Sequence, residues 1–230
     1  MTASAERPLR LIEGSPSSRE VAALSQDGAA HLSGATLEGV DLSGLDLTGW
    51  RFERCDLRRA DFFGATLEEA AFLHCKGGLA RFSTARLNDA LFRNSDFNNA
   101  GFVRALLTGA SFESCKLTGA DFSAAKALDL RFKETVLVSA RLNDLSFRKE
   151  HLVRVDFSMA ELSGCDFREA ILEDCSLKEA HVVMARFEGA DLRRADISGL
   201  RLGEAERFQG AIISPEQAAL ILRQTGLLVR

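Results

Sequence analysis

The sequence predicts an all-β solenoid, in which the chain winds into a rod of regular coils. Large apolar residues recur at every fifth position from Leu32 to Leu202, with no insertion or deletion. Two positions before each of these central residues lies a small or apolar residue, most often alanine. Two inward residues in every five fit neither the 3.6-residue period of a helix nor the two-residue period of a strand. A short period sustained over this length is typical of a solenoid.

The phenylalanines indicate how many sides each coil has. Twelve of the 16 fall into three series in which neighbours are separated by four repeats of five. The series are Phe52, Phe72, Phe92, Phe112 and Phe132; Phe62, Phe82, Phe102 and Phe122; and Phe147, Phe167 and Phe187. Four repeats per turn predict a square coil, with each ring stacked on its counterpart about 4.8 Å away. Because the third series lies on a different side, we expect the core packing to rotate by a quarter turn after Leu137 and Leu142.

Two central positions, Gly77 and Ala127, lack a large side chain. Each is followed four repeats later by a phenylalanine, Phe97 or Phe147, at the same position of the next coil. We predict that each ring leans back into the gap, because packing of this kind conserves the volume of the core.

Residues 1–29 contain no five-residue repeat, and we predict that they form an N-terminal cap or a partly flexible segment. The stretch "SPSSREVAALSQDG" favours a short capping helix, with Ser18 as its N-cap and Gly28 at its end. A cap is expected here because an open coil end could grow by pairing with another edge.

Residues 30–204 form the repeat region of 35 pentads, and residues 205–230 form a C-terminal helix and tail. Ser214 is the expected N-cap, Pro215 the first helical residue and Gln217 the partner in a capping box, while Gly226 ends the helix. The apolar residues here predict either a lid on the last coil or a dimer interface about a two-fold axis. The candidate interface residues are Ala218, Ile221, Leu222, Leu227, Leu228 and Val229.

Composition argues against several classes of function. The net charge is −4 with both signs abundant, so we expect no direct nucleic-acid binding. No apolar run approaches 18 residues and the start lacks a signal-peptide core, which predicts a cytoplasmic protein without a membrane segment. The five cysteines lack metal-site spacing. The four histidines lie in separate repeats, and no catalytic motif is present, so neither an enzyme nor a cofactor or metal is predicted.

The repeats "ADLRR", "ADFFG" and "CDLRR" resemble the A(D/N)LXX signature of the pentapeptide-repeat proteins, and the resemblance covers residues 30–204. It implies a right-handed quadrilateral β-helix, whose nearly nine coils would make a rod roughly 40 Å long. The C-terminal tail resembles the dimerisation module of the topoisomerase-protecting members, the Qnr and mycobacterial fluoroquinolone-resistance types. The loop insertions of Gram-negative Qnr proteins are missing from this sequence.

The resemblance implies a homodimer that binds DNA gyrase or topoisomerase IV through a DNA-like shape. Such binding would protect the enzyme from quinolone-like drugs or toxins, including a toxin made by the same cell. Two acidic columns on the outer faces are the candidate binding residues. They are Asp41, Asp61, Asp121 and Glu161, and Asp56, Asp96, Asp156 and Asp196.

Charge is a weak argument for DNA mimicry in this sequence. Duplex DNA carries one charge every ~1.7 Å, whereas basic residues interrupt both acidic columns and a third face is mildly basic. An aspartate just before a central residue is also explained by hydrogen bonding within a turn. The alternative function is a general protein-interaction scaffold with an unknown partner, which outward-facing apolar residues favour. These residues are Leu128, Val136, Val138, Val153, Met159, Val183 and Met184.

Overall fold

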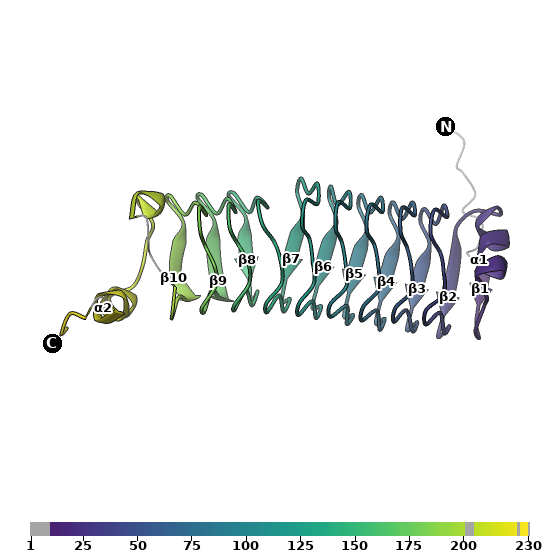
Figure 1. Ribbon diagram of the computed structural model, residues 1–230, viewed down its shortest axis with the longest axis horizontal. Coiled ribbons are helices and arrows are strands. Elements are labelled where there is room, and N and C mark those ends of the chain that lie inside the picture. The colour runs from purple at the N-terminus through teal and green to yellow at the C-terminus, as the bar shows by residue number, and fades with distance from the viewer. Residues whose placement is uncertain (1–9, 201–204, 225, 230) are drawn as a thin grey trace, which may run out of the picture.

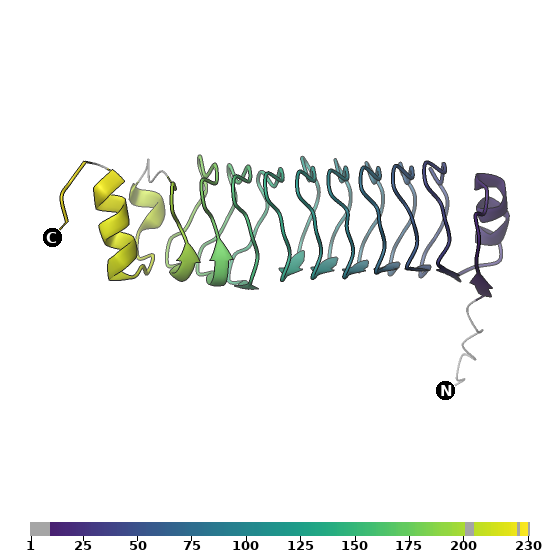
Figure 2. The same cartoon turned by 90° about the horizontal axis from the view of Figure 1, so that it is seen from below.

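The computed structural model describes residues 10–200, 205–224 and 226–229. They form a long right-handed quadrilateral β-helix, with helix α1 (Ser18–Ser25) at one end and helix α2 (Pro215–Gln224) at the other (Figures 1 and 2). One side of the rod is a parallel sheet of ten strands whose spatial order follows the chain. The strands are β1 (Arg10–Ile12), β2 (Ala30–Ser33), β3 (Arg51–Glu53), β4 (Ala71–Leu73), β5 (Leu91–Arg93), β6 (Ser111–Glu113), β7 (Arg131–Lys133), β8 (His151–Val153), β9 (Ile171–Ser176) and β10 (Asp191–Asp196).

The core of the rod is a set of columns built from the central residues. Phe52 stacks on Phe72 with ring centroids 4.9 Å apart, and Phe62 stacks on Phe82 at 4.8 Å. Rings on adjacent sides meet edge to face, as Phe52 and Phe62 do at 6.0 Å and 85°. Both arrangements are favourable for aromatic pairs. The predicted coil of four repeats and the predicted stacking are therefore confirmed.

Each corner of the coil is a tight turn. The Ala60 N–H donates to the carbonyl of Leu57 at 3.0 Å, and Arg59 lies in the left-handed region with φ 56°. Glycine adopts this conformation without steric cost, which explains Gly39 at the same position with φ 67°. Many corners instead place a polar residue there and retain the same turn.

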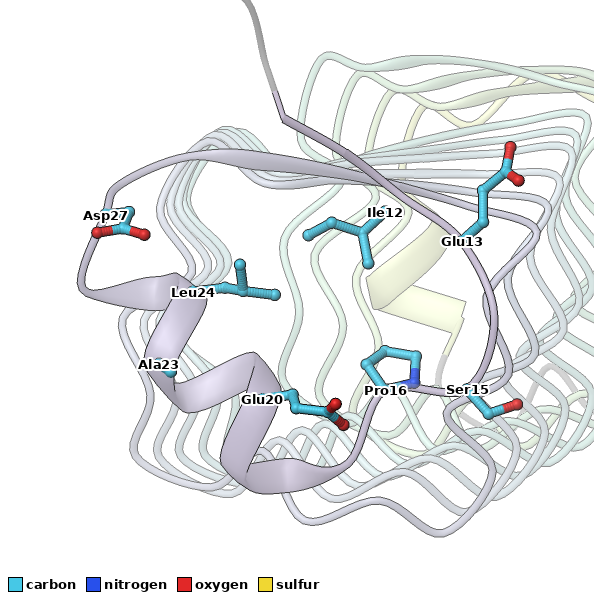
Figure 3. A pocket seen from close by; sticks show the side chains of 8 residues that line it. All are labelled: Ile12, Glu13, Ser15, Pro16, Glu20, Ala23, Leu24 and Asp27. Carbon is cyan, nitrogen blue, oxygen red and sulfur yellow. The ribbon is translucent and has the colours of Figure 1, made fainter.

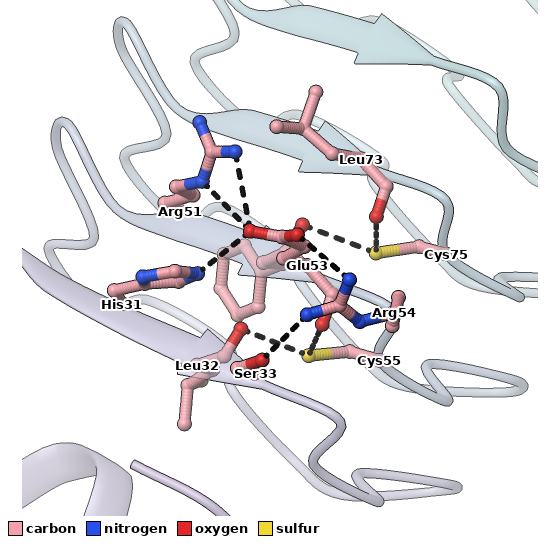
Figure 4. Close-up of polar contacts among 10 residues, drawn as sticks. His31, Leu32, Ser33, Arg51, Glu53, Arg54, Cys55, Leu73 and Cys75 are labelled. Carbon is pink, nitrogen blue, oxygen red and sulfur yellow. Dashed lines mark hydrogen bonds and ion pairs between the residues drawn. The ribbon is translucent and has the colours of Figure 1, made fainter. Parts of the chain in front are cut away.

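One inner column carries short polar side chains that hydrogen-bond to the ends of the strands. The Cys55 thiol donates to the carbonyl of Leu32 at 3.3 Å, and the Cys75 thiol donates to that of Phe52 at 3.3 Å (Figure 4). All five cysteines of the chain are buried and free. Burial raises the pKa of the Cys115 thiol to about 11. The thiols therefore act as packed side chains that also satisfy strand carbonyls.

The gap at Gly77 is filled as predicted. A methyl group placed on Gly77 would lie 1.9 Å from a carbon of the Phe97 ring, so the ring occupies that space. Phe97 is fully buried.

The prediction of a filled gap is wrong at Ala127. Ala125 and Ala127 remain partly exposed, whereas Ala105 and Leu107 one coil earlier are fully buried. The expected quarter turn in core packing occurs at the same boundary, and the Phe147 ring stacks forward on Phe167 at 4.8 Å. Figure 1 shows β7 and β8 set further apart than the neighbouring strands.

The N-terminal end contains more regular structure than the sequence predicted. The N-cap of α1 is Ser17 rather than Ser18, because Glu20 closes the capping box with Ser17. Strand β1 extends the sheet, and its Ile12 pairs with Leu32. Ile12 lies one full coil before Leu32, so the period itself could have revealed this extra strand. The first nine residues lie outside the part of the chain that the structure describes.

The C-terminal end closes the rod. In the 3₁₀ helix η1 (Ala205–Phe208), Phe208 stacks on Phe187 at 4.9 Å and continues the aromatic column. Ser214 and Gln217 form the predicted capping box at the start of α2. The Gln217 amide also donates to the carbonyls of Leu192 and Ala195, both at 2.7 Å. The central residue Leu202 lies outside the described residues.

Candidate interaction surface

The outer surface is organised in columns, because each residue lies beside its counterpart in the next coil. Isolated parallel bridges join Asp41 to Asp61, and Asp121 to Arg141. We call this file of residues column A. Column A contains Asp41, Asp61, Arg81, Gly101, Asp121, Arg141, Glu161 and His181. The four predicted acids thus share one column, but basic residues stand between them.

A second file, column B, holds the other predicted acids. Bridges join Asp56 to Lys76, Lys76 to Asp96 and Asp96 to Lys116, so that the charges alternate along this part of the column. Column B contains Thr36, Asp56, Lys76, Asp96, Lys116, Val136, Asp156, Ser176 and Asp196. Alternating charges produce no extended field of one sign.

The aspartates of both columns serve the turns first. The Asp41 carboxylate accepts the backbone N–H of Ser43 at 2.9 Å, and the Asp196 carboxylate accepts that of Ser198 at 2.9 Å. The other five aspartates among the predicted acids accept in the same way from the residue two positions ahead. The side-chain and backbone hydrogen bonds from Ser43 hold the pKa of Asp41 below its usual range.

Arginines neutralise three of the predicted acids, and a histidine contacts a fourth. Arg81 pairs with Asp61, Arg141 pairs with Asp121 at 3.0 Å, Arg58 pairs with Asp56 at 2.6 Å, and His181 contacts Glu161 at 3.4 Å. Within the described ranges, the other four predicted acids form no ion pair. These are Asp41, Asp96, Asp156 and Asp196. The Arg58 guanidinium lowers the pKa of Asp56 by hydrogen bonding to it.

The mildly basic face is also largely paired. Glu53 contacts Arg51 and Arg54 at 3.2 Å each and His31 at 3.1 Å (Figure 4). Arg194 contacts Asp174 at 2.8 Å in the same way. Arg194 and Asp174 lie one coil apart along the sequence, and this spacing of an acid and a base is a signal for pairs between coils that the sequence prediction did not use.

Sequence comparison identifies the repeat. The profile described as "Pentapeptide repeat region" matches residues 45–122 and 105–181, and "Pentapeptide repeats (8 copies)" matches residues 170–205. The chain belongs to the pentapeptide-repeat family. No curated protein sequence matches it.

Two solved structures of QnrB1, described as a plasmid-mediated fluoroquinolone resistance protein, share this fold. A trypsin-treated variant has a TM-score of 0.73 and 24% identity, and covers 88% of this chain and 100% of its own. The full-length protein has a TM-score of 0.71 and 22% identity, and covers 87% of this chain and 100% of its own. At this identity the likeness establishes the pentapeptide-repeat rod.

The outward apolar residues of this pentapeptide-repeat rod do not gather into one patch. Leu128 and Met159 are exposed, but they lie on different sides of the coil. Val136, Val138 and Val153 are only partly exposed. Val183 and Met184 form a separate pair near the C-terminal end, where Arg207 donates to the Met184 carbonyl at 3.1 Å.

The predicted dimer residues divide into two groups. Ile221 packs against the core of the rod, and Ala218 is partly buried. Leu222, Leu227 and Leu228 are exposed, Leu228 by 86%; Val229 is partly exposed. Helix α2 is therefore a lid, and the lid still presents leucines to solvent. The lid and the interface need not exclude each other.

A pocket of about 500 Å³ lies at the opposite end, between α1 and the segment that follows β1 (Figure 3). Ile12, Pro16 and Leu24 give it an apolar wall, and Glu13 and Glu20 are acidic. Glu20 is held in the capping box of α1. No metal-binding group of three His, Cys, Asp or Glu side chains occurs in the ranges that the structure describes. Nor is any helix there long and apolar enough to span a membrane.

Proposed function

We propose that this pentapeptide-repeat rod is a non-enzymatic binding protein of a type II DNA topoisomerase. By occupying the DNA-binding region of DNA gyrase or topoisomerase IV, it would protect the enzyme from quinolone-like drugs or toxins. One observation carries the proposal: the chain folds into the same rod as the fluoroquinolone-resistance protein QnrB1, over 88% of its length.

Shape supports the proposal better than charge. Arginines neutralise three of the eight predicted acids, and column B alternates in sign between Asp56 and Lys116. The binding surface would then consist of the regular square outline and the acids without ion pairs. Asp96 and Asp156 are the two of these that lie in the middle of column B.

We propose further that the rod is a homodimer joined through its C-terminal lids. The exposed leucines Leu222, Leu227 and Leu228 supply apolar surface beyond what the lid needs to cover the last coil. Two lids related by a two-fold axis would bury these leucines and double the length of the rod.

Supercoiling by purified gyrase, with and without ciprofloxacin, tests the proposal. At micromolar concentration the rod should restore supercoiling in the presence of the drug or inhibit supercoiling on its own. If neither happens with gyrase or topoisomerase IV, the proposal is wrong.

Matched variants would locate the surface. Asn in place of Asp keeps the turn acceptor and removes the charge, so Asp96→Asn with Asp156→Asn should weaken the effect on gyrase. The same change at Asp61, which already pairs with Arg81, is the control and should alter the effect less. Equal effects would point to shape alone.

The neutralised surface favours a second candidate, a protein-interaction scaffold without any topoisomerase partner. The supercoiling measurement separates the two, because a scaffold would leave gyrase unaffected. Light scattering tests the dimer on its own: Leu227→Glu with Leu228→Glu should halve the mass, and an unchanged mass would show that α2 only caps the rod.

A further inference from the structure

The rod contains a seam between residues 125–132 and residues 145–152, where one coil meets the next. Elsewhere along the rod's middle, the backbone N–H of a central residue donates to the following coil, as Leu107 does to Lys126 at 2.8 Å. The structure describes every residue of the two coils that meet at the seam. There, within these described residues, the N–H groups of Ala127 and Asp129 make no backbone hydrogen bond to the following coil. Those of Ser146 and His151 make none to the coil before, which is also fully described. Among the described residues, the bridge that would join Lys126 to Ser146 is missing too.

The strand pair at the seam is reduced in the same way. Most neighbouring strands of the sheet pair at three positions, as β6 and β7 do. Strands β7 and β8 pair only at Lys133 and Val153. The wider spacing of β7 and β8 in Figure 1 agrees with this loss of pairing.

The other two sides of the same coil boundary are closed. The Leu117 N–H donates to the carbonyl of Val136 at 2.8 Å, and the Phe122 N–H donates to that of Arg141 at 2.8 Å. The ion pair between Asp121 and Arg141 crosses the boundary on the closed part. A boundary bonded on one part and open on the other can bend about its bonded part, as a hinge does.

The sequence gives a reason for the open part. Ala127 supplies too little volume at a central position, and the aromatic columns change sides at this boundary. Phe132 and Phe147 meet there at 6.2 Å and 50°, which is neither a stack nor an edge contact. Phe147 contacts Phe157 at 5.6 Å and stacks on Phe167 at 4.8 Å, and both of these rings lie on the side of Phe147 away from Ala127.

We propose that this seam is a built-in hinge, which divides the rod into two rigid stacks that change their mutual angle. Bending opens the partly exposed Ala125 and Ala127 and their backbone groups, and closing brings them towards Leu145 and Phe147. A rod with a central hinge adapts its curvature to a partner without unfolding either stack. This proposal does not depend on which partner the rod binds.

Distances between two nitroxide labels test the hinge. Labels at Asn88→Cys and Arg148→Cys cross the seam, and labels at Thr48→Cys and Thr108→Cys have the same separation in sequence but lie within the first stack, away from the seam. Both pairs lie on one side, three coils or about 14 Å apart along the rod. The five native cysteines are buried and should not react with the label. The crossing pair should show a longer and broader distribution than the pair within the stack, and equal distributions would overturn the proposal.

Closing the seam supplies the second test. Ala127→Leu restores a large central residue beneath Phe147, an arrangement already present at Leu137 beneath Phe157, and both of these are fully buried. The distribution of distances between the two labels that cross the seam should then become as narrow as that of the pair within the stack. Leu128→Ala, which changes an exposed neighbour, is the control and should leave it broad. If Ala127→Leu leaves the distribution broad in a folded rod, the undersized centre does not cause the hinge; the wild-type comparison holds even if this variant fails to fold.

Discussion

Gly77 and Ala127 are the two central positions without a large side chain, and the rod accommodates them in opposite ways. At Gly77 the ring of Phe97 fills the space, and the Gly77 N–H still donates to the Asp96 carbonyl at 2.6 Å. At Ala127 the gap stays open, and the same hydrogen bond is missing between two coils that the structure describes in full. The two sites share the chain direction and the repeat length, and in both the residue 20 positions later is a phenylalanine.

The difference lies in the aromatic neighbours of the two rings. Phe97 contacts Phe72 and Phe82 of the preceding coil, both at 5.8 Å, and Phe92 of its own coil at 5.1 Å. Phe147 has phenylalanines at the same two earlier positions, but Leu142 stands where Phe92 would be. The ring of Phe147 stacks instead on Phe167 of the following coil at 4.8 Å. The two sites therefore differ in the aromatic neighbour within the ring's own coil and in the residue one coil later, which is Leu117 after Phe97 and Phe167 after Phe147.

The largest expected effect comes from removing the rings themselves. Phe97→Ala should lower the free energy of unfolding by about 4–5 kcal/mol, because the new cavity would join the space over Gly77. Phe147→Ala should cost less, about 3–4 kcal/mol, because its boundary is already open. Urea unfolding measures both, and a larger loss for Phe147→Ala would contradict the comparison.

Filling the gap at Gly77 should also destabilise the rod. Gly77→Ala places a methyl group against the Phe97 ring and should cost about 1–3 kcal/mol. Phe97→Leu removes the clash, so the double variant should be more stable than the sum of the single changes predicts. Strict additivity in this double-mutant cycle would show that the ring does not occupy the gap.

The same kind of change at Ala127 should have the opposite sign. Ala127→Leu buries additional carbon atoms at an open boundary and should raise the free energy of unfolding by about 1–2 kcal/mol. Chemical denaturation measures the change. A destabilised variant would mean that the space over Ala127 is smaller than its exposure indicates.

Low pH should reduce the stability of the two stacks by similar amounts. This is the smallest of the effects that we expect. Hydrogen bonds from Arg58 and Arg168 hold the pKa values of Asp56 and Asp166 below their usual range. A carboxylate with a lowered folded pKa stabilises the fold above the unfolded pKa of about 3.9, and this stability is lost as the pH falls through the folded pKa. Each exposed pair should contribute below about 1 kcal/mol.

Asp56→Asn and Asp166→Asn should each reduce the loss of stability between pH 5 and pH 2 by a similar amount, as thermal unfolding would record. If only one of the two variants showed this reduced sensitivity to acid, the two stacks would differ in their surface ion pairs as well as at the seam.

The five-residue period was enough to predict the square coil, the phenylalanine columns, the quarter turn and the ring of Phe97. These follow from the sequence because every coil repeats the same local rule. Strand β1 follows this rule only at Ile12, so the period alone gives a weak signal for it. The N-cap of α1 is Ser17 and not Ser18, because Glu20 lies three residues after Ser17, as a capping box requires.

The seam and the ion pairs depend on contacts between coils that the period does not describe. Whether Phe147 leans back or forward depends on Phe167 and on the missing aromatic residue at Leu142. The charge of column A depends on which long side chain reaches its neighbour, as Arg141 reaches Asp121. Such choices are made by the three-dimensional packing of several residues at once.

Amide hydrogen exchange at Gly77 and Ala127 tests the central claim most directly, because the two N–H groups hold equivalent places in the coil. The Gly77 N–H is bonded to Asp96 and should exchange only when the rod opens. The Ala127 N–H should exchange at least about 100-fold faster, because local opening there costs little free energy. Equal protection of the two amides in the native protein would contradict the account.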